Sequence, residues 1–309
     1  TSKIAVPILL AMVWGSGIGG FGSPLGGSAN LVAISYLENI CGHEFMYIDW
    51  VSRFLPFLIL TMLLNLAILV AIKLPVKKLA NTKDYFNDVY KQLGPMSKGE
   101  KIGLSLFIIS TVLAFARPLF AESLPALRPA YIFFICGLLT FVLEDEEGKV
   151  LLTWKQAEKE LMWGMFFLFA GGLALGKMVT GTGAATKLAE VITILPLSGG
   201  IETIFAFTMF STILTEVSSN TAAASIAIPI IQSISEALGL NVIPYILVTI
   251  VAVNCAYILP VSTRAIPIGY GLEPSELFKH GVLLSVLNIL LTTVLGYIFI
   301  NYWSAFGQI

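Results

Sequence analysis

The apolar residues of this chain gather in long uninterrupted runs. A helix needs about 20 mostly apolar residues to cross a hydrocarbon core of about 30 Å. Four runs have this length and predict simple membrane-spanning helices: Phe54–Ile72, Ile102–Phe120, Leu161–Val179 and Val282–Trp303. A fifth run, Ala130–Leu143, is shorter and crosses only if its flanking residues snorkel or the bilayer thins around it.

Two further apolar stretches are broken spans. Ile4–Gly20 continues only after the glycine-rich residues Phe21–Asn30, and Val242–Ala256 continues only after Pro260–Arg264. Unwound backbone at membrane depth is costly unless it is buried in protein or lines a watery cavity. Transporters use such breaks to aim half-helix N-termini at an anion and freed carbonyl groups at a cation. The breaks therefore predict a transport function.

A third stretch, Thr203–Glu236, is split by Ser218–Thr221 into two arms of about fifteen residues. At 1.5 Å per residue each arm spans only about 22 Å, which favours a re-entrant hairpin over two full crossings. At the tip, Ser219 and Asn220 are preferred N-cap residues, and the free N–H groups of the following helical turn can bind an anion. The alternative is a capped turn between two packed helices.

An acidic residue, Glu216, lies close to this hairpin tip. An isolated carboxylate inside a membrane is costly, so Glu216 is expected to pair, to face water or to titrate. An ion pair and a proton-coupling role both remain open, and Lys177 is one candidate partner.

Composition agrees with a membrane protein, because 57% of the residues are hydrophobic and only 12% are charged, whereas soluble domains carry about 25% charged residues. A net charge of −1 argues against a nucleic-acid partner. The three cysteines and two histidines are isolated from one another, so neither a metal centre nor a disulfide framework is expected.

The distribution of charge predicts an orientation. Seven lysines and three acids lie between the Phe54–Ile72 and Ile102–Phe120 runs, which places this connection in the cytoplasm. Counting crossings then places the hairpin mouth and Ile309 outside. Within the connection, Leu79–Tyr90 predicts an amphipathic helix along the inner interface. Because an apolar run begins at once after Thr1, we expect the chain to be a piece of a longer one.

The two broken spans also predict an internal repeat. At a shift of 237 residues, Pro7 meets Pro244 and Gly17 meets Asn254. Asn220 precedes Asn254 by 34 residues, and the same spacing carried back from Gly17 lands before Thr1. We therefore expect an all-α polytopic membrane protein with inverted repeats, whose matching first hairpin precedes this sequence.

Two motifs of the chain resemble the divalent anion/sodium symporter family of di- and tricarboxylate transporters. Thr215–Thr221 looks like the family's second Ser-Asn-Thr motif, and Ile18–Pro24 looks like its first broken span. The resemblance covers nearly the whole chain, as the family's C-terminal two-thirds. It implies a homodimer in the cell membrane, in which a transport domain moves against a scaffold domain in an elevator fashion.

The resemblance divides the chain into eight segments. Three would form the transport domain: residues 1–41 and 241–270, with the broken spans, and residues 201–240, with the hairpin. The others would be scaffold spans (42–75 and 102–160), a cytoplasmic amphipathic linker (76–101), a span with an interfacial helix (161–200) and the last span (271–309).

Roles for individual residues are implied in the same way. The substrate dicarboxylate would be bound by the hairpin tip and the two breaks: Ser219, Asn220, Thr221, Gly27, Ser28, Thr263 and Arg264. One sodium site would use Thr215, Asn220 and the carbonyl group of Ser262, a second would include Gly26, and Arg264 is the candidate substitute for a cation. No catalytic residue and no cofactor besides sodium ions is expected.

The chain departs from the family at both breaks. Family members have Gly-Ser-Pro-Pro-Asn and Ala-Thr-Pro-Pro-Asn, whereas Gly26–Asn30 and Ser262–Ile266 lack the proline pairs, and the second carries Arg264. An arginine is permanently charged and can bind a carboxylate through two hydrogen bonds. If it replaces a sodium ion, the empty carrier keeps an unpaired cation at membrane depth and returns poorly. The alternatives are that Arg264 snorkels to the surface or pairs with an acid such as Glu273.

We therefore expect exchange of C4 to C5 dicarboxylates such as succinate, malate or 2-oxoglutarate, with sodium-coupled symport as the alternative. An ion channel needs a continuous polar pore lining, and the sequence shows localised breaks instead. A membrane enzyme needs a nucleophile with a base or a metal cluster, and no such set accompanies Ser219. Both classes are less favoured than a carrier.

Overall fold

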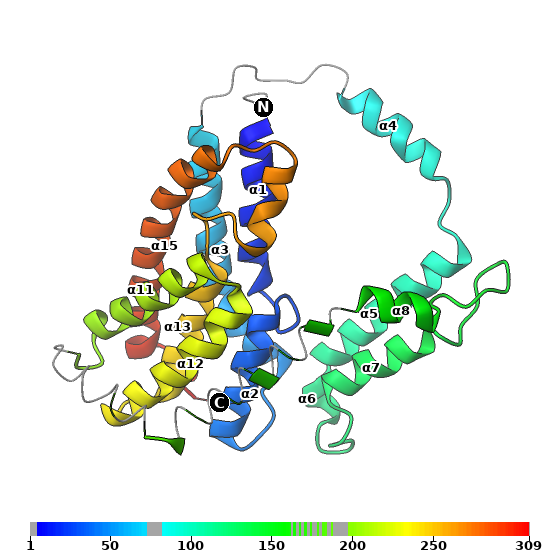
Figure 1. Cartoon of the computed structure of the whole chain (residues 1–309). Coiled ribbons are helices and arrows are strands. Elements are labelled where there is room, and N and C mark those ends of the chain that lie inside the picture. Colours follow the sequence, from blue (N-terminus) through cyan, green and yellow to red (C-terminus); the bar gives the residue numbers. More distant parts are fainter. Residues whose placement is uncertain are drawn as a thin grey trace. The chain divides into compact units, whose positions relative to one another are not determined.

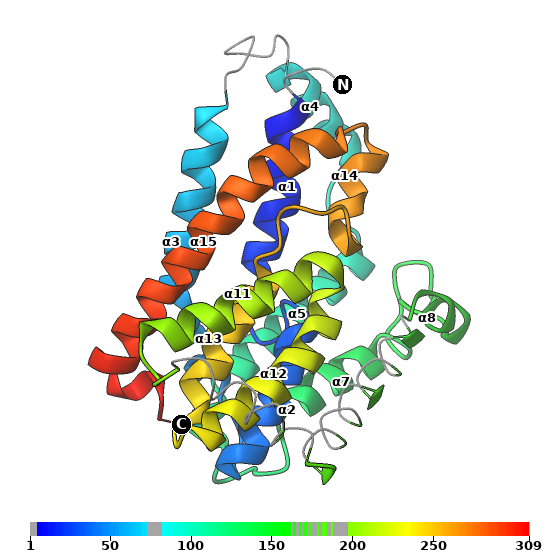
Figure 2. The ribbon, with the colours of Figure 1, turned by 60° about the vertical axis from the view of Figure 1, so that its left-hand side comes forward.

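The computed structural model describes residues 5–72, 82–161 and 197–308, and between the last two ranges only residues 163, 164, 167, 170, 171, 174, 178, 181–183 and 187. The described residues form helices joined by loops, apart from one isolated bridge between Glu144 and Val150 (Figures 1 and 2). The predicted all-α class is confirmed. The chain divides into two compact units, residues 1–45, 49–75 and 164–309, and residues 46–48 and 76–163.

The first unit contains the hairpin, both broken spans and most of the length of each of the two longest apolar helices. Its helices are α1 (Ala5–Gly20), α2 (Ser28–Cys41), α3 (Tyr47–Ala71), α11 (Ile201–Val217), α12 (Asn220–Ala237), α13 (Val242–Asn254), η1 (Ser262–Ala265), α14 (Ile266–Gly269), α15 (Pro274–Tyr302) and η2 (Ser304–Phe306).

Helices α11 and α12 form the predicted hairpin. They lie side by side, and both pack on α13 (Figures 1 and 2). At 17 and 18 residues, each arm is roughly 26 Å long, shorter than a hydrocarbon core. At the open end the Tyr245 hydroxyl group donates to the Gly199 carbonyl group over 2.7 Å. The tip falls at Ser218 and Ser219, as predicted.

Both broken spans are confirmed as interrupted helices. Helix α1 ends at Gly20, residues 21–27 are unwound, and α2 follows; helix α13 ends at Asn254, residues 255–261 are unwound, and η1 follows. The continuations differ, since α2 has 14 residues whereas η1 and α14 have 4 each. The inverted repeat stays a prediction.

A buried indole binds each unwound segment. Trp50 donates to the Phe21 carbonyl group over 2.8 Å, and Trp14 donates to the Tyr257 carbonyl group over 3.3 Å. All four side chains are fully buried. Carbonyl groups freed by unwinding thus find partners inside the protein, as backbone at membrane depth requires.

The uninterrupted runs are confirmed in part. Among the described residues, α3 and α15 are the helices long and apolar enough to cross a membrane, and they contain nearly all of two of the predicted runs. The run Ile102–Phe120 is wrong as a single helix, because it divides at Ala116 into α5 (Lys98–Phe115) and α6 (Arg117–Phe120). A proline in the first turn of α6 and the Arg117 side chain, which donates to two loop carbonyl groups, account for the division.

The second unit contains α5, α6 and three further helices: α4 (Thr82–Leu93), α7 (Pro129–Leu139) and α8 (Trp154–Glu160). Helix α7 covers most of the predicted run Ala130–Leu143 and packs on α5. The run Leu161–Val179 lies largely outside the described residues.

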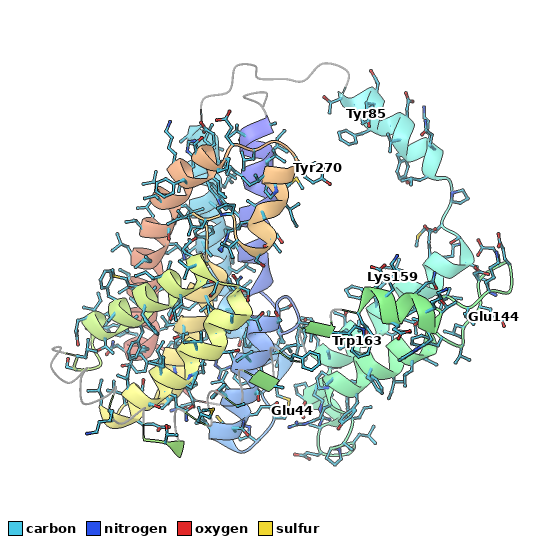
Figure 3. All side chains as sticks on the ribbon, in the orientation of Figure 1. Glu44, Tyr85, Glu144, Lys159, Trp163 and Tyr270 are labelled. Carbon is cyan, nitrogen blue, oxygen red and sulfur yellow. The ribbon has the colours of Figure 1, made fainter. Side chains whose placement is uncertain are left out.

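Helix α4 is the predicted amphipathic helix, although residues 79–81 of that prediction also lie outside the described part. All of its large apolar side chains are exposed: Tyr85, Phe86, Val89, Tyr90 and Leu93. Tyr85 is labelled in Figure 3. Because these positions share one face of a helix, the amphipathic pattern is confirmed. Its place at the inner interface stays a prediction.

Candidate functional site

The hairpin tip presents the N-terminus of α12. Ser219 is the N-cap, and its hydroxyl group accepts a hydrogen bond from the Ala222 N–H group over 3.2 Å. Within the described part of the chain, the N–H groups of Asn220 and Thr221 have no acceptor. The first N–H groups of a helix have no partner inside that helix, and the helix dipole makes this end positive. The tip can therefore bind an anionic group.

Three oxygen atoms meet behind the tip. The Thr215 hydroxyl oxygen lies 2.9 Å from Asn220 Oδ1 and 2.7 Å from the Val253 carbonyl oxygen. A hydroxyl group has one proton, so it can donate to only one of these acceptors at a time. Oxygen atoms from the hairpin and from α13 thus form a set that suits a small hard cation.

The first break reaches the tip through Ser28. Its hydroxyl group is hydrogen-bonded to that of Thr221, at the start of α12. The preceding residue, Gly27, caps α2 in an extended conformation with φ −162°. This contact brings together residues 193 positions apart in sequence.

Two buried asparagines join the two breaks. Asn254 Nδ2 donates to Asn30 Oδ1 over 3.0 Å, and Asn30 Nδ2 donates to the carbonyl groups of Gly20 and Ser23 over 2.8 and 2.9 Å. The end of α13 is thereby tied to both sides of the first unwound segment. Asn254 also donates to the Ile250 carbonyl group, one turn earlier in its own helix.

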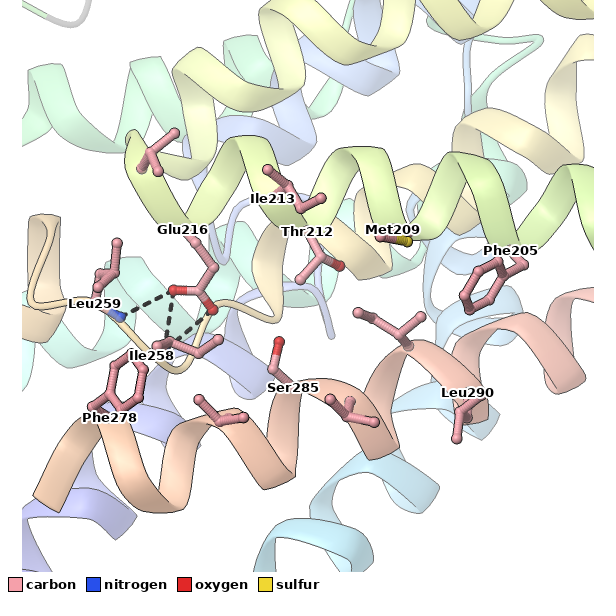
Figure 4. Close-up of a pocket in the computed structure, with 14 residues that line it drawn as sticks. Phe205, Met209, Thr212, Ile213, Glu216, Ile258, Leu259, Phe278, Ser285 and Leu290 are labelled. Carbon is pink, nitrogen blue, oxygen red and sulfur yellow. Dashed lines mark hydrogen bonds between the residues drawn. The ribbon is translucent and has the colours of Figure 1, made fainter. Parts of the chain in front are cut away.

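Glu216 binds the second unwound segment. Its carboxylate accepts hydrogen bonds from the consecutive N–H groups of Tyr257, Ile258 and Leu259, over 2.7 to 3.2 Å. Figure 4 shows the bonds from Ile258 and Leu259. These N–H groups would otherwise lack partners where α13 has ended. The carboxylate therefore stabilises the break, and α13 stops at Asn254, two residues before the predicted end of its apolar arm.

Arg264 completes this arrangement from η1. Its guanidinium group lies 3.9 Å from the Glu216 carboxylate and donates to the carbonyl groups of Thr215 and Glu216 over 3.0 and 3.4 Å. Those carbonyl groups lie in the last turn of α11, where a positive charge is favourable. Both side chains are buried, with 4% of Arg264 and 6% of Glu216 exposed.

An apolar groove of about 560 Å³ lies between α11 and α15 (Figure 4). Glu216, Thr212 and Ser285 line it together with apolar residues such as Phe205 and Phe278. Because Glu216 already binds three N–H groups and a guanidinium group, its carboxylate is held by the protein.

Comparison with known proteins identifies the class. The whole chain, residues 1–309, matches the family described as the sodium:sulfate symporter transmembrane region. The chain belongs to this family. It is accordingly a multi-pass membrane protein.

Three relatives illustrate the similarity. A sodium-dependent dicarboxylate transporter of Staphylococcus saprophyticus is 27% identical over 307 residues, which cover 96% of this chain and 59% of that protein. An uncharacterized transporter of Haemophilus influenzae is 31% identical over 310 residues, covering 94% and 62%. A sodium-dependent dicarboxylate transporter of Staphylococcus aureus is 28% identical over 277 residues, covering 87% and 53%. The chain therefore spans between about half and two thirds of the length of these relatives.

The predicted site residues of this family member do not all meet. The structure joins Thr215 to Asn220 and Ser28 to Thr221. Thr263 lines a pocket of about 170 Å³ beside α1, and among the described residues no hydrogen bond joins Ser262 to the hairpin. Ser262 has a φ of 58°, an uncommon conformation for a residue other than glycine.

Gly26 and Gly27 have different surroundings. A Cβ atom on Gly26 would lie 2.2 Å from the Gly20 carbonyl oxygen, so only glycine fits there. A Cβ atom on Gly27 would meet the Asn254 side chain at an ordinary contact distance of 3.5 Å. The first break thus needs Gly26 for its backbone fold.

The expected environment of Arg264 needs correction. Exchange was expected because the empty carrier would hold Arg264 as an unpaired cation, but the structure pairs Arg264 with Glu216. Glu273, the acid suggested for a pair, instead precedes α15 and accepts from the Ser275 hydroxyl group. Lys177, suggested as the partner of Glu216, lies outside the described residues. Glu216 does form an ion pair, as suggested, but its partner is Arg264.

Sequence reasoning overlooked Asn30 and Asn254 as site residues. Their signal was available, since each is an amide side chain at the edge of an apolar stretch, where a buried polar group needs a partner. Among the described residues, no three His, Cys, Asp or Glu side chains approach one another closely enough to hold a metal ion. A cation here would depend on neutral oxygen ligands.

Proposed function

We propose that this chain forms the substrate-binding part of a carrier that moves C4 to C5 dicarboxylates across the cell membrane. The observation that carries the proposal is the hairpin tip, where the N–H groups of Asn220 and Thr221, which have no acceptor among the described residues, adjoin the oxygen set around Thr215. One substrate carboxylate would bind at the N–H groups, and a cation in the oxygen set would offset its charge. The printed names of two relatives, sodium-dependent dicarboxylate transporters, support this substrate class.

Sodium-coupled symport is the form of transport that we favour. The Arg264 charge is offset by Glu216, which leaves the charge of a di-anion to be balanced by dissociable cations and the α12 dipole. The sodium dependence of the two relatives points the same way. From the resemblance, we further propose a homodimer that works by an elevator motion.

Exchange is the second candidate, and one observation favours it. The Arg264 guanidinium group binds the Thr215 carbonyl group, next to the hydroxyl group that would otherwise serve a cation. The permanent positive charge of Arg264 beside Thr215 would then replace part of the charge that a bound sodium ion supplies.

One experiment separates the two forms. The purified full chain is reconstituted in liposomes, and radiolabelled succinate uptake is measured with an inward sodium gradient and with potassium in its place. Each condition uses empty vesicles and vesicles loaded with unlabelled succinate. Symport predicts sodium-driven uptake into empty vesicles, whereas exchange predicts uptake only into loaded vesicles, without sodium. If no condition gives uptake above protein-free liposomes, the proposed function is wrong.

A further inference from the structure

We propose that Asn254 forms a substrate subsite that accepts a hydrogen bond from a hydroxyl group on the carbon chain of the dicarboxylate. The inference rests on the proposed function and deepens it, because it selects 2-hydroxy dicarboxylates over unsubstituted ones. It concerns one atom, the side-chain carbonyl oxygen Oδ1 of Asn254.

The orientation of the Asn254 amide follows from its hydrogen bonds. Its nitrogen, Nδ2, lies 3.0 Å from Asn30 Oδ1 and 2.9 Å from the Ile250 carbonyl oxygen. Both are acceptors, since Asn30 Nδ2 is itself used as a donor to two carbonyl groups. Only the nitrogen end of the Asn254 amide can satisfy them, so Oδ1 must point the other way.

Asn254 Oδ1 lacks a donor. The residue is 4% exposed, and no described residue donates a hydrogen bond to this oxygen. A buried amide normally uses its acceptor as well as its donors, so this acceptor is available to a ligand. The other polar side-chain atoms of Asn30 and Asn254 all have hydrogen-bond partners, so Asn254 Oδ1 is the one acceptor of this pair that a ligand can use.

The oxygen faces two glycines beside the hairpin tip. A Cβ atom would lie 3.5 Å from Asn254 Oδ1 if placed on Gly27 and 3.6 Å if placed on Gly20. The residue after Gly27 is Ser28, whose hydroxyl group is bonded to Thr221. Because Gly20 and Gly27 carry no side chain, neither residue covers the oxygen with one.

The chemistry of a carbonyl oxygen decides what it recognises. It repels a carboxylate and accepts a hydrogen bond from a hydroxyl group. Malate and succinate have the same carbon chain and differ by one hydroxyl group, so malate would satisfy Asn254 Oδ1 and succinate would leave it unpaired. A site built to bind a substrate hydroxyl group discriminates strongly against the analogue that lacks it.

The test compares how malate and succinate inhibit uptake of radiolabelled succinate by the reconstituted full chain. The original protein should be inhibited about tenfold more strongly by malate. Asn254→Ser, which shortens the side chain, should bring the ratio close to one.

A second variant leaves the amide network in place. Gly27→Ala covers Asn254 Oδ1 with a methyl group, and the extended backbone at Gly27 accepts alanine. It should lower the malate preference to the same extent. Gly15→Ala, where a Cβ atom meets nothing within 4 Å, is the control and should keep the ratio unchanged.

Each other outcome overturns the subsite. An original protein without malate preference would do so, as would variants that weaken both inhibitors equally or that alter only the sodium requirement. Absence of any succinate uptake by the original protein would instead reject the proposed function itself, so the two failures can be told apart.

Discussion

Arg264 and Glu216 face each other across 3.9 Å in the buried region where the hairpin tip meets the second break. Glu216 binds three N–H groups of the unwound segment, while Arg264 binds two carbonyl groups in the last turn of α11. The pair therefore ties the hairpin to the second broken span through backbone atoms on both sides. Its role in the structure is to hold these two elements together.

The first prediction concerns this pair. Glu216→Gln should destabilise the protein by roughly 3 to 5 kcal/mol, because it leaves Arg264 buried without a counter-charge. Arg264→Leu should have a similar effect, and the double variant should be less damaged than the two losses added. Thermal unfolding in detergent measures the cycle. Lys91→Ala, in the exposed pair with Asp88, is the control and should change little. Strictly additive losses would contradict the coupling.

The second prediction concerns the first break. Gly26→Ala should abolish folding to a monodisperse protein, because its methyl group would lie 2.2 Å from the Gly20 carbonyl oxygen. Gly19→Ala places a methyl group where nothing lies within 4 Å and should be tolerated. Size-exclusion chromatography of both variants gives the answer, and equal behaviour of the two would show that the tight turn at Gly26 is not required.

The breaks could be predicted from the sequence, but the pairing across them could not. Glycine, proline and serine inside apolar stretches place the interruptions within a few residues, because these residues favour unwound backbone. Arg264 and Glu216, by contrast, are 48 residues apart. Their contact depends on how η1 packs against the end of α11. The sequence instead suggested Glu273 as the partner of Arg264, because it is closer along the chain.

The contact between the two asparagines could not be predicted from the sequence either. Asn30 and Asn254 are separated by 224 residues, and only the folded arrangement of α2 and α13 joins them. The Ser219–Thr221 motif was easier to interpret, since an N-cap followed by alanines has local consequences for α12. Local signals thus predicted the hairpin tip, whereas long-range packing determined its partners.

The third prediction concerns the oxygen set behind the tip. Thr215→Val keeps the shape of the side chain and removes its hydroxyl group, so the sodium concentration for half-maximal succinate uptake should rise about tenfold. Thr208→Val is the matched control, because this buried hydroxyl group in the same helix has no partner within the described part of the chain. Equal sodium requirements in the two variants would remove Thr215 from the cation site.

The fourth prediction concerns topology. Single cysteines at Asn87 and Gln308, both exposed, are introduced after Cys41 and Cys136 are replaced by serine. The lysine-rich connection predicts that a membrane-impermeant thiol reagent labels position 87 only from the cytoplasmic side and position 308 only from outside. Labelling in the opposite sense would reverse the orientation.

The central claim is that the hairpin tip binds the substrate, and Asn220 tests it most directly. Asn220→Ala removes the side chain that accepts from Thr215 at the start of α12. Ser218→Ala is the neighbouring control, because the Ser218 hydroxyl group donates to the Leu214 carbonyl group of the preceding helix, α11. Both variants are reconstituted at equal amounts of folded protein, and initial rates of radiolabelled succinate uptake are compared. We predict that Asn220→Ala loses at least about 90% of the uptake, because it removes Oδ1 from the oxygen set whose cation would offset the charge of the bound substrate, while Ser218→Ala retains most of it. Uptake by Asn220→Ala at the rate of the unaltered protein would contradict the assignment of the site.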